Sequence, residues 1–367
     1  MYSHTYTNSD SHSHRNEDSS SWHPDSNTSA PTTTYSKRKR TDPALPDATT
    51  HSKRQKVSRS GYRSTNDDTI LVQYHYNSRP KVDISKRGES KIIFMRNFNN
   101  WVKSVLIGRH AVRGGTVLDL GCGKGGDLLK WKKAGIARYI GLDIAEVAIK
   151  HAKERWRDMK VRSTIKNKGR KFVVEFNTLD CFSFPLSTKI SRTCEFDVVS
   201  MQFSLHYAFE NKSRARMALR NITSNLKQGG KFIGTIPDAN WIVKRLKALP
   251  KDELAFGNEI YNIRFEQKET FPTFGHKYWF WLADAVDCPE YLVHFRTFER
   301  LAAEYGLELK YKKRFHDVYN EAKDEQTFRE LLYVMKVIRE NPDDGEMSEA
   351  EWEAAGLYIA FAFEKVR

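Results

Sequence analysis

The sequence has few cysteines and no long apolar run. Its four cysteines, Cys122, Cys181, Cys194 and Cys288, lie far apart and form no Cys-x-x-Cys pair. This spacing argues against a disulfide framework and a structural zinc site, and it favours a reducing compartment. No segment approaches the roughly 18 apolar residues needed to span a bilayer, and residues 1–30 have no apolar signal-peptide core. We therefore expect neither an integral membrane protein nor a secreted one.

Large aliphatic residues are missing from the beginning of the chain. No Ile, Leu, Val or Phe precedes Leu45, and 15 of the first 35 residues are Ser or Thr. Such a segment cannot bury enough apolar surface to offset the entropy of ordering it, so we predict a disordered tail over residues 1–68. Basic clusters at 37–40 and 53–56 are typical of a bipartite nuclear-import signal, although a solvated linker that touches RNA would have the same composition. The first interpretation predicts a nuclear protein.

Positive charge is in excess over the whole chain. The 61 Lys and Arg residues outnumber the 46 Asp and Glu residues, which gives a formal net charge of +15. Residues 1–66 contribute ten basic and six acidic side chains, so +11 of the +15 lies in the remainder of the chain. This balance predicts an acidic partner, and nucleic acid is the commonest one.

From Thr69 onward, short β-like runs alternate with amphipathic helical patterns, which predicts a parallel sheet with helices on both faces. The predicted strands are 116–120, 139–143, 171–178, 196–201, 231–237, 307–314 and 357–365. The predicted helices are 92–106, 126–134, 146–160 and 213–226. The segment at about 240–293 is irregular and rich in aromatic residues. We interpret it as an insertion in a catalytic domain at 69–367 that builds part of a pocket, although a satellite hydrophobic cluster is equally natural.

A glycine-rich loop follows the first predicted strand. Gly121, Gly123 and Gly126 have the spacing GxGxxG, and Asp143 lies 22 residues after Gly121, at the end of the next predicted strand. This pattern suits either a nicotinamide dinucleotide or S-adenosylmethionine, because both contain a ribose whose hydroxyls an acidic residue can bind.

Two further carboxylates favour S-adenosylmethionine. Asp119 lies two residues before the first glycine, where a negative charge would repel a pyrophosphate but suits the donor's ammonium group, directly or through water. Asp180 follows the third predicted strand and is placed to accept a hydrogen bond from the adenine amino group. The alternative is that both carboxylates merely cap neighbouring helices.

Several motifs in a fixed order carry a family resemblance. They are YNSRP at 76–80, RNFNNWVK at 96–103, the glycine-rich loop, QFSLHY at 202–207, and EWEA at 351–354 leading to Tyr358. With them the sequence resembles the eukaryotic mRNA cap guanine-N7 methyltransferases over residues 74–367. The resemblance implies a class I S-adenosylmethionine-dependent methyltransferase fold, an α/β fold with a seven-stranded, mostly parallel sheet, an antiparallel last strand and helices on both faces.

The resemblance also implies two sets of site residues. The methyl-donor site would comprise Lys103, Gly121, Asp143, Asp180, Gln202 and Tyr207. The cap site would comprise Asn99, Asn100, Lys124, Lys130, Arg155, His206, Glu290 and Tyr358. No metal and no general acid or base is expected, and the residues expected to position the reactants are His206, Tyr207, Glu290 and Tyr358.

The chemistry of the implied cap residues suits a phosphorylated guanosine. Lys124, Lys130 and Arg155 could neutralise a triphosphate. The Glu290 carboxylate could accept hydrogen bonds from guanine N1–H and the 2-amino group, an arrangement that adenine does not present. His206 could donate to guanine O6. Because guanine N7 has a free lone pair and no proton, the protein needs only to align N7 with the methyl group for in-line displacement.

We therefore expect an enzyme that methylates N7 of the GpppN cap guanine, with S-adenosylmethionine as donor and the capped pre-mRNA 5′ end as substrate. Other capping enzymes or RNA polymerase II are further candidate partners, and no membrane is expected. Two alternatives remain open. One is a class I methyltransferase acting on another RNA position or a small molecule, and the other is a non-catalytic RNA-binding relative.

Overall fold

The computed structural model describes residues 66–79, 88–164, 172–341 and 345–367. The basic clusters and nearly all of the tail predicted over 1–68 lie outside these ranges. The predicted tail boundary is wrong by three residues, because helix α1 (Asn66–Ser78) begins at residue 66. Asp68 anchors the start of this helix: its carboxylate accepts a hydrogen bond from the Tyr291 hydroxyl at 2.6 Å and lies 3.3 Å from the Lys277 ammonium.

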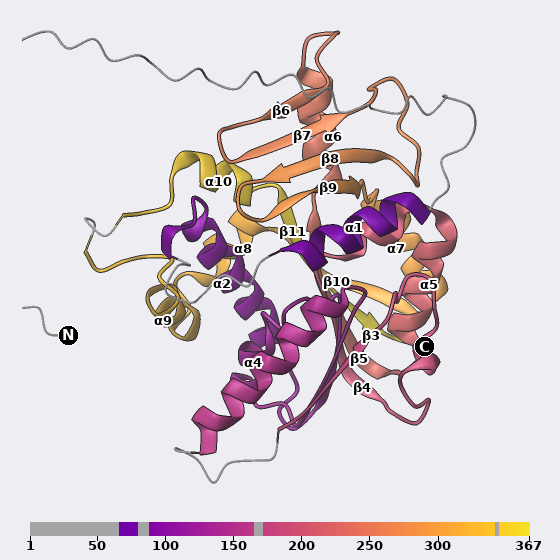
Figure 1. Ribbon diagram of the computed structural model, residues 1–367, viewed down its shortest axis with the longest axis vertical. Helices are drawn as coiled ribbons and strands as arrows, with labels where there is room; N and C mark the ends of the chain where they lie inside the picture. Colours follow the sequence, from indigo (N-terminus) through magenta and orange to yellow (C-terminus); the bar gives the residue numbers. More distant parts are fainter. Residues whose placement is uncertain (1–65, 80–87, 165–171, 342–344) are drawn as a thin grey trace, which may run out of the picture. The chain divides into compact units, whose positions relative to one another are not determined.

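Seven strands form the main sheet, in the order β10-β11-β5-β4-β1-β2-β3 (Figure 1). They are β1 (Thr116–Leu120), β2 (Arg138–Asp143), β3 (Val173–Thr178), β4 (Phe196–Gln202), β5 (Leu226–Pro237), β10 (Leu307–Arg314) and β11 (Tyr358–Lys365). The last strand, β11, is antiparallel to both of its neighbours, whereas β1, β2, β3, β4 and β5 pair in parallel. The predicted class I methyltransferase sheet is confirmed.

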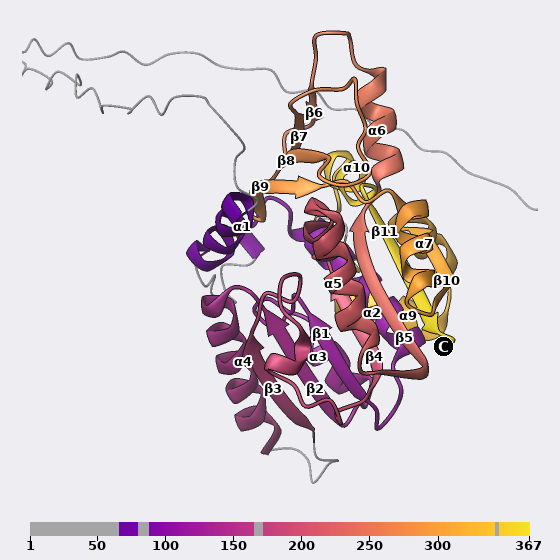
Figure 2. The same ribbon diagram turned by 90° about the vertical axis from the view of Figure 1, so that its right-hand side faces the viewer.

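Helices cover both faces of this sheet (Figures 1 and 2). The helices after α1 are α2 (Ile93–His110), α3 (Leu128–Lys133), α4 (Glu146–Thr164), α5 (Lys212–Thr223), α6 (Ala239–Ala248), α7 (Phe295–Glu304), α8 (Phe315–Ala322), α9 (Gln326–Val334) and α10 (Glu349–Ala355). Two short 3₁₀ helices are η2 (Leu186–Thr188) and η3 (Leu205–Glu210). Successive strand residues point to opposite faces: Val117 belongs to the apolar cluster that includes residues of α2, α3 and α4, whereas Leu118 belongs to the cluster that includes residues of α5 and α7. In the described part of the chain, no helix has the length and apolarity needed to cross a bilayer.

The aromatic segment at 240–293 forms a second, four-stranded antiparallel sheet beyond one end of the main sheet (Figure 2). Its strands are β6 (Ala255–Gly257), β7 (Tyr261–Phe265), β8 (Lys277–Leu282) and β9 (Val286–Tyr291). One face is buried and the other is solvated, as is common in antiparallel sheets: along β7, Ile263 is buried and Arg264 is exposed. The last residue of β9, Tyr291, lines the main cavity.

Helix α2 is held at its first turn by a residue far away in the sequence. Ile92, which precedes α2, provides no side-chain cap. The Glu351 carboxylate instead accepts hydrogen bonds from the backbone N–H groups of Phe94 and Met95, both at 3.1 Å. A negative charge is favourable at a helix N-terminus, and Glu351 is only 3% exposed, so this contact is shielded from water. The EWEA motif thus fixes the helix that carries RNFNNWVK.

Candidate active site

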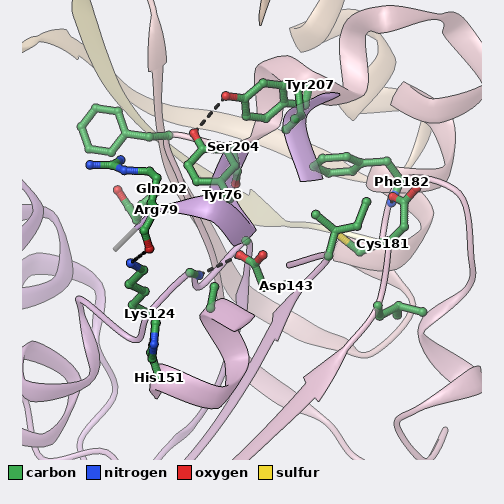
Figure 3. A pocket seen from close by; sticks show the side chains of 18 of the residues that line it. Tyr76, Arg79, Lys124, Asp143, His151, Cys181, Phe182, Gln202, Ser204 and Tyr207 are labelled. Atoms are coloured by element: carbon green, nitrogen blue, oxygen red, sulfur yellow. Dashed lines mark hydrogen bonds between the residues drawn. The ribbon is translucent and has the colours of Figure 1, made fainter. Parts of the chain in front are cut away.

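A cavity of about 910 Å³ opens at the carboxyl ends of the central strands. Gly121 follows β1, Asp143 ends β2, Asp180 follows β3 and Gln202 ends β4, and all four residues line the cavity. Asp143 and Gln202 are labelled in Figure 3. The strand order reverses between β1 and β4. In open α/β sheets this switch point is where ligands bind. The cavity is large enough for more than one small ligand.

The glycine-rich loop brings backbone close to the cavity. Gly121 has φ +71°, and a Cβ atom added there would lie 2.5 Å from the Ser204 hydroxyl oxygen. Gly123 has φ +52°, and its N–H donates to the Asp143 carboxylate at 2.8 Å (Figure 3). The left-handed backbone favours glycine at both positions, and at Gly121 there is also no space for a side chain. The loop leaves room for a ligand against the main chain.

Five of the six predicted methyl-donor residues line this one cavity. They are Gly121, Asp143, Asp180, Gln202 and Tyr207. The sixth, Lys103, is outside the lining, and its ammonium lies 2.9 Å from the Asp127 carboxylate. Burial raises the pKa of Asp143, and two backbone N–H groups partly offset this effect. A carboxylate already held by amides and facing a cavity is well oriented to accept further hydrogen bonds from ribose hydroxyls.

An ion-paired arginine lies beside the predicted adenine-binding residue. One guanidinium nitrogen of Arg214 lies 3.2 Å from the Asp180 carboxylate, and another lies 3.2 Å from the Glu210 carboxylate. Arg214, Glu210 and Phe182 all line the cavity. Sequence reasoning missed these three residues. Arg214 and Glu210 are spaced as an ordinary i, i+4 surface pair, so the sequence contained no signal that distinguished them.

Asp119, predicted to bind the donor's ammonium group directly or through water, is buried outside the cavity lining. It is 2% exposed, does not line the cavity, and accepts a hydrogen bond from the Tyr139 hydroxyl at 2.6 Å. The predicted direct contact with an ammonium group is therefore not available from the cavity surface. Burial, followed by the nearby charge of Asp127, raises the pKa of Asp119 from 3.8 to about 7.

This raised pKa predicts that the difference in free energy of unfolding between the protein and its Asp119→Asn variant depends on pH. The unfolded chain ionises Asp119 near pH 4, whereas the folded chain keeps it protonated up to about pH 7. The folded state of the wild type therefore loses stability, relative to the always neutral variant, as the pH rises from about 4 to about 7. Urea unfolding at several pH values measures the difference. Two parallel stability curves would contradict the raised pKa.

Three predicted residues meet in a buried polar cluster centred on Asp127. The ammonium groups of Lys103 and Lys130 lie 2.9 Å and 2.7 Å from its carboxylate, and Lys130 also donates to the Asn100 side-chain oxygen at 2.8 Å. The neighbouring Asn99 has a buried side-chain oxygen with no hydrogen-bond partner in the described ranges. The structure thus brings Asn100, Lys103 and Lys130 together, but around an acidic residue that the sequence analysis did not identify.

The three residues predicted to recognise guanine are also close together. His206 Nε2 lies 3.3 Å from Glu290 Oε1, and Glu290 Oε2 accepts a hydrogen bond from the Tyr278 hydroxyl at 2.6 Å. His206 Nδ1 has no hydrogen-bond partner within the part of the chain that the structure describes. Tyr358 packs edge-on against Phe203, with ring centroids 4.9 Å apart. His206, Glu290 and Tyr358 are at most 5% exposed and do not line the cavity.

Phe203 and two tyrosines lie between this buried trio and the cavity. Phe203 lines the cavity in a left-handed conformation with φ +55°, a strained position for a residue with a side chain. The hydroxyls of Tyr76 and Tyr207, which also line it, are 3.0 Å apart (Figure 3). Tyr76 belongs to α1, and α1 supplies further lining residues: Asp68, Thr69 and Val72. The YNSRP motif indicated this region, but no site role was predicted for it.

Cationic side chains gather at one side of the cavity. The predicted Lys124 and Arg155 line it, together with Arg79 and Arg96, which were not predicted. The Lys124 ammonium donates to the Arg79 carbonyl at 2.9 Å (Figure 3), and burial lowers the pKa of Lys124. A polyanionic group such as a triphosphate is the natural ligand for this set. Among the described residues, no group of three or more His, Cys, Asp or Glu side chains is arranged to hold a metal ion.

Comparison with known proteins adds independent information. Residues 60–366 match the family model described as the mRNA (guanine-N(7))-methyltransferase domain. The mRNA cap guanine-N(7) methyltransferase of Schizosaccharomyces pombe is 45% identical over 304 residues, which cover 80% of this chain and 82% of that protein. The protein of the same name from Cryptococcus neoformans (strain JEC21) is 48% identical over 304 residues, 81% of this chain and 48% of its own length. The chain therefore spans about half the length of the Cryptococcus relative.

Proposed function

Since this chain belongs to the mRNA (guanine-N(7))-methyltransferase domain family, we propose that it is an enzyme that methylates N7 of the GpppN cap guanine, with S-adenosylmethionine as methyl donor. One observation carries the proposal. A single cavity is lined both by the strand-end residues that we propose bind the donor nucleoside and by a cationic set that suits a triphosphate. A small neutral metabolite would not require those cations.

The donor half of the cavity fits S-adenosylmethionine. Asp143 would bind the ribose hydroxyls, Asp180 the adenine amino group, and the main chain at Gly121 would lie against the ligand. Gln202, Tyr207 and Lys103 complete the proposed donor site. S-adenosylmethionine supplies a methyl group that its sulfonium has already activated. Gly123 also lines the cavity, and the open space that a Cβ atom there would enter supports this fit.

The cap half would hold the guanosine and its phosphates. Lys124 and Arg155 line the cavity and would neutralise the triphosphate. The proposal adds Lys130, Asn99 and Asn100 as further contacts, although these three lie outside the cavity lining. Each carboxylate oxygen has two lone pairs, so Glu290 retains acceptor capacity for guanine after accepting from Tyr278. The unpartnered His206 Nδ1 is a further group that substrate could satisfy. Because this trio is buried, binding would require Tyr76 or Phe203 to move.

No proton has to be removed from the nucleophile, because N7 carries a lone pair and no hydrogen. The residues of this chain therefore act by orienting two bound ligands. Such alignment lowers the activation free energy by at most about 7–11 kcal/mol. Phe203, Tyr207 and Tyr358 provide apolar and aromatic walls that tolerate a positive charge on either reactant. We assign no general base, and His206 serves in positioning.

The substrate and location follow from the same proposal. A capped pre-mRNA 5′ end is the substrate, and the excess of 61 basic over 46 acidic residues suits an RNA ligand. We place the protein in the nucleus, where other capping enzymes or RNA polymerase II would be its partners. The basic clusters proposed to direct import lie outside the described residues.

Methyl transfer to a cap dinucleotide tests the proposal. The protein is incubated with S-adenosylmethionine carrying a labelled methyl group and with GpppG, and the product is digested to nucleosides. We expect label in 7-methylguanosine alone. The matched control substrate has carbon in place of N7 in both guanines, and it should accept no label. Label in the control substrate, or in any other nucleoside from GpppG, would overturn the assignment of N7.

A further inference from the structure

A second, smaller cavity of about 500 Å³ adjoins the first. It lies between the end of α1, the residues before α2, and the turn that joins β8 to β9. Its lining includes Glu89, Ser90, Trp281 and Asp287. Two further lining residues, Arg79 and Arg96, also line the larger cavity, so the two cavities meet at these guanidinium groups.

The β8–β9 turn holds both arginines in place. The guanidinium groups of Arg79 and Arg96 each donate to the Asp284 carbonyl at 2.6 Å, and Arg79 also donates to the Ala285 carbonyl. Asp284 has φ +53°, a left-handed conformation. Its carboxylate accepts from the Ser90 hydroxyl at 2.9 Å, which ties the turn to the residues before α2. The two cations are therefore fixed on the boundary between the cavities.

An aromatic surface faces the smaller cavity. Trp281 lies on β8 and is 37% exposed, although large aromatic side chains are usually buried. The next outward residue on the same strand, Trp279, donates its indole N–H to the Asp287 carboxylate at 2.7 Å and lines neither cavity. An exposed indole at the wall of a cavity is a stacking surface for a planar base.

We propose that the smaller cavity binds the first transcribed nucleoside of the capped RNA, with its base against Trp281 and with the triphosphate passing Arg79 and Arg96 into the larger cavity. This inference rests on the proposed function and names a further subsite of it. A cap consists of two nucleosides joined by a polyanion, and the protein offers two cavities joined by two cations. Glu89 and Asp287 suit ribose hydroxyls, which donate hydrogen bonds, and do not suit phosphates.

Calorimetric titration with two ligands tests this subsite. GpppA and GTP are each titrated into the full-length protein saturated with S-adenosylhomocysteine, so that no turnover occurs. GpppA is expected to bind about tenfold more tightly than GTP, since stacking of one base has about that effect. Trp281→Ala should remove this advantage of GpppA, and Trp281→Phe should retain most of it. Tyr333→Ala is the control: Tyr333 on α9 is 46% exposed and lines neither cavity, so the ratio of the two dissociation constants should not change.

Three outcomes would overturn the inference. They are equal affinities of the wild type for GpppA and GTP, an equal loss of both affinities in Trp281→Ala, and a loss of the affinity ratio in Tyr333→Ala as large as that in Trp281→Ala. Each of them leaves the proposed function intact if GpppG is still converted to its N7-methylated product. Absence of both binding and methyl transfer would overturn the proposed function and this subsite together.

Discussion

Replacing Glu290 with Gln is expected to lower kcat/KM for GpppG on the order of 10³-fold while leaving the dissociation constant for S-adenosylmethionine unchanged. Gln has nearly the same shape as Glu but is neutral, and it carries an NH₂ group. Guanine presents two donors, N1–H and the 2-amino group. The variant loses a charge-assisted acceptor and places its own NH₂ donor opposite one of the guanine donors. Each hydrogen bond to a charged group is worth about 1.5–3 kcal/mol, and two of them give the expected factor.

The structure supplies a control for this substitution. Glu290 is 3% exposed and accepts a hydrogen bond from the Tyr278 hydroxyl at 2.6 Å. Tyr278→Phe removes that hydroxyl and keeps the carboxylate, so kcat/KM should fall by less than about tenfold. Thermal unfolding separates lost recognition from lost stability. Comparable losses in the two variants, or weaker binding of S-adenosylmethionine by Glu290→Gln, would show that Glu290 supports the fold and does not read the base.

The regular part of the fold could be predicted because its signals are local. The predicted strands 116–120 and 307–314 coincide with β1 and β10. The apolar run of β1 is nearly continuous, that of the first half of β10 alternates, and a glycine directly precedes each strand. Gly121, Asp143 and Asp180, at the ends of β1 to β3, followed from the same order, because parallel strands place their carboxyl ends along one edge. Gln202, at the end of β4, was implied only by the family resemblance.

The small sheet was not predicted as strands because its alternation is hidden. Along β8, the buried Tyr278 and Phe280 alternate with Trp279 and Trp281, which face outward but are equally apolar. A period of two therefore does not appear in hydropathy. The interpretation of this segment as an insertion was compatible with the sequence, but its architecture depended on tertiary packing.

Long-range polar contacts were also beyond prediction. Ser348 and Glu351 have the spacing of a capping box, which is visible in the sequence and present in α10. The same carboxylate also caps α2, more than 250 residues away, and no local pattern indicates that. The cluster around Asp127 is similar: Lys103 and Lys130 were predicted to bind ligands, whereas their shared carboxylate was overlooked.

Replacing Asp127 with Asn is expected to lower the free energy of unfolding by about 3–5 kcal/mol, the largest stability effect that we predict. The variant keeps the shape of the side chain but leaves the ammonium groups of Lys103 and Lys130 without their counter-charge. Each of these lysine side chains is only 13% exposed, so water cannot replace the lost partner. Urea denaturation at pH 7 measures the change. Glu304→Gln is the control, since it breaks the exposed Arg216–Glu304 pair and should leave the midpoint unchanged.

The pH dependence distinguishes an ionic cluster from ordinary packing. Burial alone would raise the pKa of Asp127, but Lys103 and Lys130 outweigh it and hold the pKa below its ordinary value. Because the unfolded carboxylate ionises near pH 4 and the folded one at lower pH, the stabilisation is complete above about pH 4 and is lost as the pH falls toward the folded pKa. The test is made in the Asp119→Asn background, because the Asp127 charge also raises the pKa of Asp119. There the loss of stability caused by Asp127→Asn should be constant from about pH 5 to 7 and shrink in more acidic solution. A difference that does not change down to about pH 2 would mean that the variant loses packing, because a packing defect does not depend on protonation.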